Sequence, residues 1–287
     1  MESYAARRAA ADTKRLSEIP KPMIKLLGIP FDGNSSFLKG PSLAPPLIRQ
    51  MDKSGSSNCF SEFGKEIKEG VSYTDIGDLS FNDTKAESVF AHIRNTIITE
   101  LQHTGKMICF GGDHSVSYPV IDAFAEKYND LSILHLDAHA DLYEDFDNNP
   151  FSHASPFARI MERGNVKALT QAGIRTLNTH QRAQADKFGV TVIEMKDFNM
   201  DFISRLKGPL YISLDLDVLD PAYAPGVSHH EPGGLSTREL IHIIHRIKAD
   251  VVGADIVEYN PDRDVHKMTA MTAYKLFKEI AAKMCEQ

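Results

Sequence analysis

Short apolar runs rich in Val, Ile and Leu recur along the chain and alternate with segments of helical periodicity. Several runs lack the polar–apolar alternation of a half-exposed strand, which is typical of parallel strands covered on both faces. We predict eight strands, at residues 23–29, 71–77, 106–112, 132–139, 169–174, 190–195, 209–217 and 250–258. Helices are predicted between them, at residues 88–104, 118–128, 153–164, 179–189, 236–247 and 271–284.

Strands that alternate with helices predict an α/β fold, with a parallel sheet and helices on both of its faces. Ser236 and Glu239 form a capping-box pattern at the start of the fifth predicted helix. The sequence contains no repeat or linker that would divide it, so residues 21–287 are predicted to form a single domain. Residues 1–20 are predicted to be an N-terminal extension, either a disordered tail or a helix that contacts a neighbouring subunit.

Composition narrows the class of protein. Apolar residues make up 42% of the chain and charged residues 25%, close to the averages for soluble globular proteins. The net charge of −7 argues against a nucleic-acid partner, because phosphate backbones select basic surfaces. No apolar run reaches the roughly 18 residues that a membrane helix needs, so no membrane partner is expected.

The expected location is the cytoplasm. The start of the chain lacks the apolar core of a secretory signal, and its acidic residues count against a mitochondrial transit peptide. The three cysteines, Cys59, Cys109 and Cys285, are odd in number and widely spaced, which suits free thiols in a reducing compartment.

The clearest chemical signal is the segment SILHLDAHAD. It places Asp137, His139 and Asp141 at alternating positions, which share one face of an extended backbone. These side chains are therefore expected to converge at the end of a buried strand. Because a buried charge without a partner is costly, their convergence indicates a bound divalent cation.

Two further segments have the same character. Asp215 and Asp217 interrupt the apolar run in YISLDLDVLDP, and His114 follows a strand and a Gly-Gly turn in CFGGDHSVSYP, next to a capping or supporting Asp113. Taken alone, an aspartate before a turn is usually a solvent-exposed strand end, and a histidine after Gly-Gly fits a satisfied turn residue or a phosphate-binding loop at least as well. Four carboxylates with two imidazoles instead balance two divalent ions about 3.5 Å apart. Their many oxygen ligands favour manganese over zinc.

These segments also carry a family resemblance. Five motifs, taken in order, resemble those of the ureohydrolases, the arginase and agmatinase family. They are GGDHS, DAHAD, SHASPFARI, SLDLDVLDP with PGVSHHEPGG, and DIVEYNP. The likeness extends from about Met23 to the C-terminal helix. Within the family, GNSSFLKGPSLAPPLIR, HASPFARIME and APGVSHHEPGGLS are most similar to plant-type arginases.

The resemblance implies a three-layer α/β/α fold around an eight-stranded parallel sheet. It also implies two Mn²⁺ ions per subunit and a homotrimer or homohexamer. By this likeness one ion is held by His114, Asp137, Asp141 and Asp215. The other is held by Asp137, His139, Asp215 and Asp217, so that Asp137 and Asp215 bridge the pair.

The implied activity is hydrolysis of a guanidino group with release of urea, first of all L-arginine to L-ornithine and urea. The predicted catalytic groups are His153, which matches the family's proton-carrying histidine, Glu258, which matches the carboxylate that binds the guanidinium, and the ligand Asp141. Two metals lower the pKa of a bridging water from about 15.7 to near neutrality. Taken alone, His153 would be a surface histidine and Glu258 a member of a strand-end salt bridge.

Substrate choice is less well defined. Arginine and agmatine differ by an α-carboxylate, so polar groups at the pocket rim must distinguish them. The predicted substrate-binding residues besides Glu258 are Asn148, Asn149, Ser152 and Asn178. The carboxylate-binding pattern of animal arginases is not reproduced, so agmatine or another small guanidino compound stays open as the substrate.

Some alternatives remain. Deacetylases with a related fold use one zinc and an Asp, His, Asp set, which would leave Asp141 and Asp217 without a role. An inactive paralogue is a further alternative, although all six ligand positions are filled. His229 and His230 lie in a Gly- and Pro-rich loop and are expected to be exposed rather than to bind a third metal.

Overall fold

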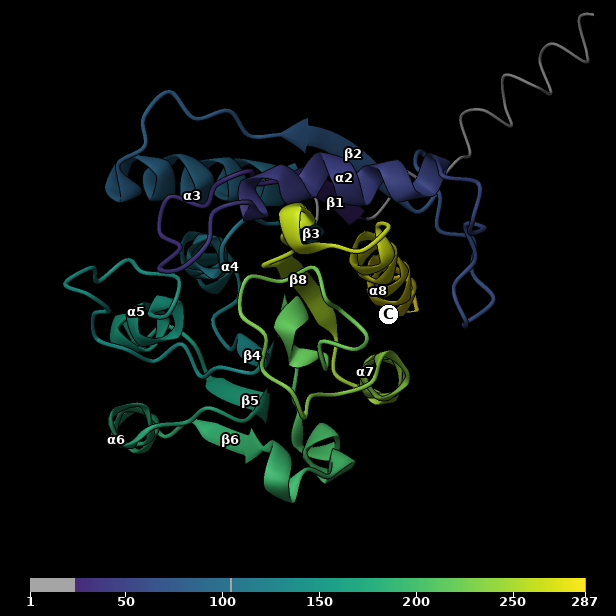
Figure 1. The fold of residues 1–287 in the computed structure, drawn as a ribbon. Helices are drawn as coiled ribbons and strands as arrows, with labels where there is room; N and C mark the ends of the chain where they lie inside the picture. The colour runs from purple at the N-terminus through teal and green to yellow at the C-terminus, as the bar shows by residue number, and fades with distance from the viewer. Residues whose placement is uncertain (1–23, 104, 287) are drawn as a thin grey trace, which may run out of the picture.

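The computed structural model of this protein describes residues 24–103 and 105–286. These residues contain one parallel eight-stranded sheet in the order β2-β1-β3-β8-β7-β4-β5-β6 (Figure 1). The strands are β1 Ile24–Gly28, β2 Tyr73–Asp78, β3 Lys106–Phe110, β4 Ser132–Leu136, β5 Ala168–Ile174, β6 Thr191–Glu194, β7 Leu210–Asp215 and β8 Val251–Val257. The predicted N-terminal extension lies outside the described residues, so its role stays a prediction.

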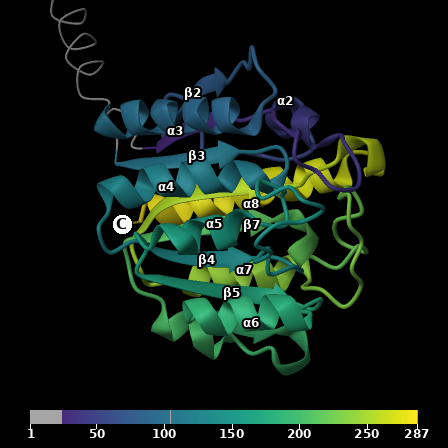
Figure 2. The same cartoon turned by 90° about the vertical axis from the view of Figure 1, so that its left-hand side faces the viewer.

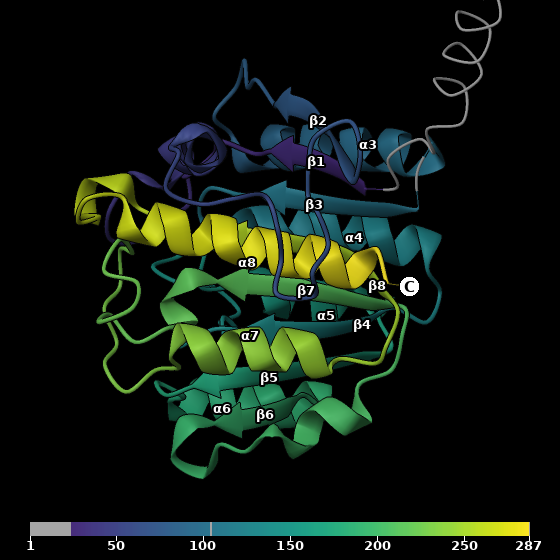
Figure 3. The ribbon, with the colours of Figure 1, turned by 90° about the vertical axis from the view of Figure 1, so that its right-hand side faces the viewer.

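Helices cover both faces of the sheet, which confirms the predicted three-layer α/β/α fold. One face carries α3 Ala86–His103, α4 Ser117–Lys127, α5 Pro156–Arg163 and α6 Thr179–Phe188 (Figure 2). The other carries α7 Thr237–Arg246 and α8 Met268–Met284, with α2 Ala44–Gln50 beside α8 (Figure 3). No helix among the described residues is long and apolar enough to cross a membrane.

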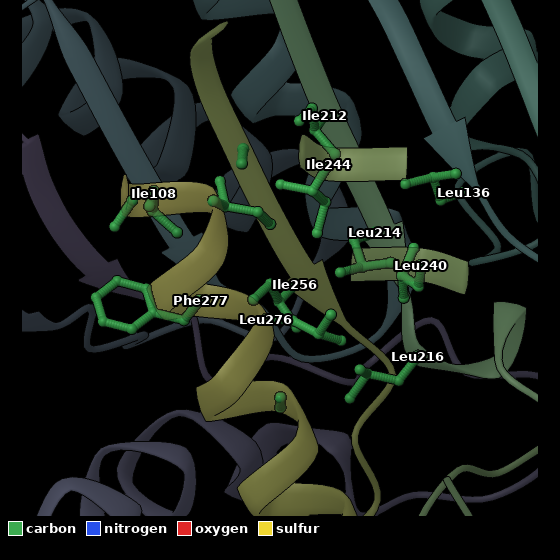
Figure 4. Close-up of a cluster of buried hydrophobic side chains, with 14 of the residues drawn as sticks. Ile108, Leu136, Ile212, Leu214, Leu216, Leu240, Ile244, Ile256, Leu276 and Phe277 are labelled. Carbon is green, nitrogen blue, oxygen red and sulfur yellow. The ribbon is translucent and has the colours of Figure 1, made fainter. Parts of the chain in front are cut away.

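Each face of the sheet has its own apolar core. Figure 4 shows the core under α7 and α8, where Leu240 and Ile244 of α7 and Phe277 of α8 pack on side chains of the central strands. A second core lies under α3, α4 and α5, and it includes Phe124 and Phe157. Each such side chain contributes about 1.5–3 kcal/mol when it is buried. The central strands β3, β8, β7 and β4 are therefore held rigidly from both sides.

The sequence pattern missed α2 and misplaced several strand ends. Helix α2 is short and has Pro45 and Pro46 within its first turn, where proline is tolerated because the missing N–H would be unpaired anyway. The strands predicted over residues 132–139 and 209–217 end earlier, at Leu136 and Asp215. The acidic segment after Leu136 is therefore a loop and not an extended strand.

The predicted capping box at α7 is confirmed. Ser236 Oγ accepts the backbone N–H of Glu239 at 3.2 Å, and the Glu239 carboxylate accepts the backbone N–H of Ser236 at 2.8 Å. Two N–H groups that the helix itself leaves unpaired are thereby satisfied.

Replacing Ser236 with alanine should lower the free energy of unfolding by about 1 kcal/mol, because the Glu239 N–H loses its acceptor. Urea denaturation followed by circular dichroism measures the change. Ser204→Ala, at an exposed serine that does not begin an α-helix, is the control and should stay within about 0.5 kcal/mol of wild type. Equal losses in both variants would contradict the capping role.

Candidate active site

The predicted catalytic and metal-binding residues come together at the carboxyl ends of four adjacent strands. His114 follows β3, Asp137 to Asp141 follow β4, Asp215 ends β7 with Asp217 two residues beyond it, and Glu258 follows β8. These are the central strands of the sheet. A parallel sheet opens its crevice at this edge, where the backbone no longer fills the space between strands.

The two acidic loops are shaped by their own carboxylates. Asp137 Oδ1 accepts the backbone N–H of His139 at 2.6 Å, and Asp215 Oδ1 accepts the backbone N–H of Asp217 at 2.7 Å. The backbone of Asp141 has a φ of 50°, in the left-handed region. The alternation of a strand was therefore the wrong reason for the convergence of Asp137, His139 and Asp141. Tight turns closed by aspartate side chains bring them together.

The Gly-Gly turn after β3 allows a close approach between backbones. A Cβ on Gly112 would lie 1.8 Å from the carbonyl oxygen of Phe31, so only glycine fits. The Gly112 carbonyl accepts the N–H of Glu258 at 2.9 Å, and the Glu258 carboxylate accepts the N–H of His114 at 2.8 Å. These two hydrogen bonds fix Glu258 relative to His114.

A buried histidine nitrogen without a hydrogen bond marks the first metal position. Asp255 accepts the hydroxyl hydrogen of Ser213 at 2.7 Å, so the Ser213 oxygen accepts from His114 Nε2 at 3.0 Å. His114 Nδ1 is then left facing oxygens of Asp137, Asp141 and Asp215 at 3.1, 3.1 and 3.3 Å, with no hydrogen-bond partner among the described residues. A lone pair directed at three carboxylates fits a site that a cation completes.

The second metal position lies beside the first. His139 Nδ1 is 2.9 Å from Asp217 and 3.4 Å from Asp137, and these three residues could hold an ion together. The first group of potential ligands contains His114, Asp137 and Asp141. Because Asp137 belongs to both groups, the arrangement is that of a binuclear site with a bridging carboxylate.

His135 also lies in the first group, and the sequence analysis overlooked it. The Gln171 amide donates to His135 Nδ1 at 3.0 Å, so Nε2 carries the hydrogen and donates to Asp137 at 2.7 Å. Burial lowers the pKa of His135, which suits a neutral donor. His135 therefore orients a ligand and does not bind metal itself. Its position two residues before Asp137, on the same strand face, was the available signal.

The charges at this site are in conflict without a cation. Burial and the neighbouring Asp217 and Asp137 raise the pKa of Asp215 well above its ordinary value. Burial opposes the charged form of His139, yet Asp217 and Asp137 outweigh it and raise the pKa of His139 to about 12. In the absence of metal, protons take the place of the ions. Metal binding must release them, so affinity should increase with pH.

His153 and Glu258 form a pair beside the metal positions. His153 Nδ1 donates to Glu258 Oε1 at 2.8 Å, while Nε2 accepts the backbone N–H of Ser36 at 3.2 Å and lies 2.8 Å from the Ser36 hydroxyl oxygen. Burial opposes protonation of His153, but Glu258 outweighs it and raises the pKa of His153 to about 9. The other Glu258 oxygen, Oε2, is buried with no hydrogen-bond partner among the described residues.

A pocket of about 230 Å³ leads to these groups. Its lining includes Ser36, His139, Asp141, Tyr143, Phe146, His153, Thr176, Gln181, Asp215, Asp217, His229, Glu231 and Glu258. Half-buried His229 is among these residues, whereas exposed His230 is not. The expectation that both histidines are exposed holds only for His230.

The four predicted rim residues have other contacts and are not among the lining residues of the described pocket. Asn178 caps α6 and donates to the Tyr143 hydroxyl at 2.6 Å. Asn149 and Ser152 accept N–H groups within their own loop, and Asn148 has a φ of 60°. Their role in substrate binding stays a prediction. Tyr143, Thr176 and Gln181, which the sequence analysis did not select, line the pocket instead.

A parallel three-layer fold with two overlapping carboxylate–histidine clusters at its carboxyl edge defines a metal-dependent α/β hydrolase. The chain belongs to the arginase family, whose model matches residues 23–282, and it is an amidinohydrolase of that family. It is 47% identical to Arginase 1, mitochondrial, of Arabidopsis thaliana over 92% of this chain and 82% of the relative. An agmatinase of Bacillus anthracis is 32% identical over 90% of both chains.

A solved structure confirms the resemblance to plant-type arginases. Arginase from Medicago truncatula superposes with a TM-score of 0.88 at 39% identity, covering 97% of this chain and 92% of that one. The prediction of a ureohydrolase most similar to plant-type arginases, with the corresponding fold, is therefore correct.

The expected cytoplasmic location is wrong. The Arabidopsis thaliana relative at 47% identity is named mitochondrial, and a second at 45% identity, covering 92% of this chain and 81% of the relative, is named Arginase 2, chloroplastic/mitochondrial. These names point to an organelle. Free cysteines indicate only a reducing environment, which does not distinguish the cytosol from the interior of an organelle.

Removing the shared ligand should empty both metal positions. Purified protein titrated with Mn(II) should bind two ions per chain, and Asp137→Ala should bind none tightly, because Asp137 contributes to both groups. Metal analysis after gel filtration gives the stoichiometry. Asp145→Asn, at an exposed position in the same loop, is the control and should retain two ions. A single tightly held ion in wild type would contradict the binuclear site.

Proposed function

We propose that this protein is a manganese-dependent arginase that hydrolyses L-arginine to L-ornithine and urea. The observation that carries the proposal is the buried Glu258 carboxylate, which has one oxygen without a partner among the described residues and lies next to two overlapping metal-ligand groups. Likeness to plant arginases supports arginine as the substrate. The family assignment gives no support to the single-zinc deacetylase alternative.

The two manganese ions would be held by the two histidines and four aspartates at the strand ends, namely His114, His139, Asp137, Asp141, Asp215 and Asp217. When bound, the metal pair would supply a nucleophile from water at neutral pH and stabilise negative charge in the transition state. The Asp255–Ser213–His114 and Gln171–His135–Asp137 hydrogen bonds hold two of these ligands in fixed orientations.

Glu258 is proposed to bind the substrate's guanidinium. A guanidinium carries only N–H donors, and a carboxylate accepts two of them side by side. Oε2 needs such a donor, since its burial without one is costly. The backbone of Glu258 has a φ of 63°, and its side chain is held by the His114 N–H, so the carboxylate is oriented before substrate arrives.

His153 is proposed to carry the proton that the leaving amine requires. Its Nδ1–H remains bonded to Glu258, so Nε2 is the nitrogen that gains and loses a proton. The Ser36 hydroxyl can accept from a protonated Nε2 and donate to a neutral one, because a hydroxyl does both. The Ser36 hydroxyl therefore accommodates both states of His153, whereas the Ser36 N–H favours the neutral one.

Agmatine is the second candidate substrate. Among the described residues, no lysine or arginine lines the pocket, so an α-carboxylate would rely on neutral donors such as Tyr143, Thr176 and Gln181. The agmatinase relative supports the same alternative. Assembly into a homotrimer or homohexamer, implied by the family resemblance, also stays a prediction.

With Mn(II), the protein should release urea from L-arginine with a kcat/KM at least about 10-fold higher than from agmatine, 4-guanidinobutyrate or guanidine. Polar groups that hold the α-carboxylate would be left unpaired by the other compounds. A colorimetric urea assay measures the ratio. A larger kcat/KM for agmatine would refute arginine as the substrate and leave the hydrolase proposal intact. Absence of urea from every compound would refute both.

His153→Asn should lower kcat by about 100- to 10,000-fold while two metals stay bound, because the proton carrier is lost. Wild-type kcat/KM should rise as the pH passes through the pKa of His153, since His153 must be neutral before it can accept a proton, and the variant should lack this component of the rise. Glu258→Gln should chiefly raise KM. His92→Asn, at an exposed position on α3, is the control. An unchanged pH profile in His153→Asn would exclude His153 as the carrier.

A further inference from the structure

Three atoms at this site share an unusual property. His114 Nδ1, Glu258 Oε2 and His229 Nε2 are buried side-chain atoms that have no hydrogen-bond partner among the described residues. The proposed function gives the first to a metal and the second to the guanidinium. The third has no assigned role. A buried polar atom without a partner is destabilising, so within a ligand pocket it indicates a contact that the ligand supplies.

The ring of His229 lies at the reacting end of the pocket. Its centroid is 5.7 Å from that of His139, a proposed metal ligand, and 5.5 Å from that of His153, the proposed proton carrier. Phe37 packs on His229 at 5.3 Å between centroids. His229 therefore borders the space between the metal positions and the Glu258–His153 pair, where the guanidino group must lie.

The loop that carries His229 is fixed on both sides. Ser228 accepts from the Asn260 amide at 2.9 Å, and the Arg175 guanidinium donates to the Glu231 carbonyl at 2.6 and 2.9 Å. The neighbouring His230 is satisfied by Pro225 and Arg263 and is exposed. Of the two adjacent histidines, only His229 lines the pocket and has a buried nitrogen with no partner among the described residues.

We propose that His229 binds the substrate, with Nε2 accepting a hydrogen bond from an N–H of the guanidino group. The inference rests on the proposed function. It gives the guanidino group a second hydrogen-bond acceptor besides Glu258. A guanidinium has five N–H donors and no acceptor, so the unprotonated nitrogen of a neutral imidazole is the matching partner.

This role predicts a specific pattern across substrates. The guanidino group is common to L-arginine and agmatine, so loss of the acceptor should affect both equally. A residue that contacts the α-carboxylate or α-amino group would instead change the ratio between them. His229→Leu should lower kcat/KM about 10- to 100-fold for both substrates and should raise the inhibition constant of guanidinium ion by a similar factor.

The test compares three variants of the full-length, Mn(II)-loaded protein. His229→Gln places an amide oxygen near the position of Nε2 and should recover most of the activity that His229→Leu loses. His230→Leu disturbs the same loop on its outer side and should stay within about 2-fold of wild type. Metal content and melting temperature of each variant show whether the site and the fold are intact.

Each other outcome would overturn the inference. Unchanged kinetics in His229→Leu, or a loss for one substrate alone, would exclude a contact to the guanidino group. Equal losses in the Leu and Gln variants together with a lower melting temperature would show that the ring only packs. If wild type releases urea and His229→Leu does so equally well, the proposed function stands without the inference. If wild type releases no urea from either substrate, both fall.

Discussion

Mutual repulsion among buried carboxylates is the constraint on which the rest of this structure depends. Asp137, Asp215, Asp217 and Glu258 are each at most 4% exposed, and they lie at the ends of neighbouring strands. Placing several negative charges together in a poorly solvated site is costly, and burial alone favours their neutral forms. The fold must therefore hold them together in advance, so that cations and not rearrangement relieve the conflict.

Backbone hydrogen bonds do much to keep these carboxylates in place. The N–H groups of Ala138 and His139 donate to Asp217 and Asp137, and the N–H of His114 donates to Glu258. A backbone donor is fixed by the chain around it, so it stabilises a carboxylate without the entropy cost of ordering a long side chain. The rigid sheet between its two apolar cores keeps these loops in register with one another.

The sequence was sufficient for the architecture because the central strands β3, β8, β7 and β4 are buried along their whole length and the strands alternate with helices of clear periodicity. It was sufficient for the charged cluster because acidic residues that interrupt a buried apolar run are costly unless they bind a cation. It was insufficient for the backbone of the loops. The turn after Leu136 is closed by a hydrogen bond from a backbone N–H to an aspartate side chain. The alternation of polar residues in the sequence resembles that of a strand, but it is not what brings these side chains together.

The hydrogen-bond partners of individual side chains were the other feature that the sequence could not predict. Asn178 was selected for its position after a strand, yet it caps α6, because asparagine accepts a helix N–H as readily as it binds a ligand. His135 and His229 were not selected as functional, because a single histidine in an apolar strand or a glycine-rich loop has no distinctive pattern. Their roles depend on which nitrogen is left unpaired, and only the three-dimensional structure contains that information.

In the proposed function, the pairing of Glu258 with His153 would link substrate binding to proton transfer. One carboxylate oxygen serves His153 and the His114 N–H, and the other remains for a guanidinium. A protonated His153 partly neutralises the carboxylate that must attract the cation, whereas a neutral His153 leaves its charge available to the substrate. Arrival of a guanidinium at Oε2 should in turn disfavour the protonated imidazole, since two cations would then share one anion. Under the proposed function, the same carboxylate would make substrate binding promote release of the proton from His153, and departure of the cation would restore the affinity of His153 for that proton.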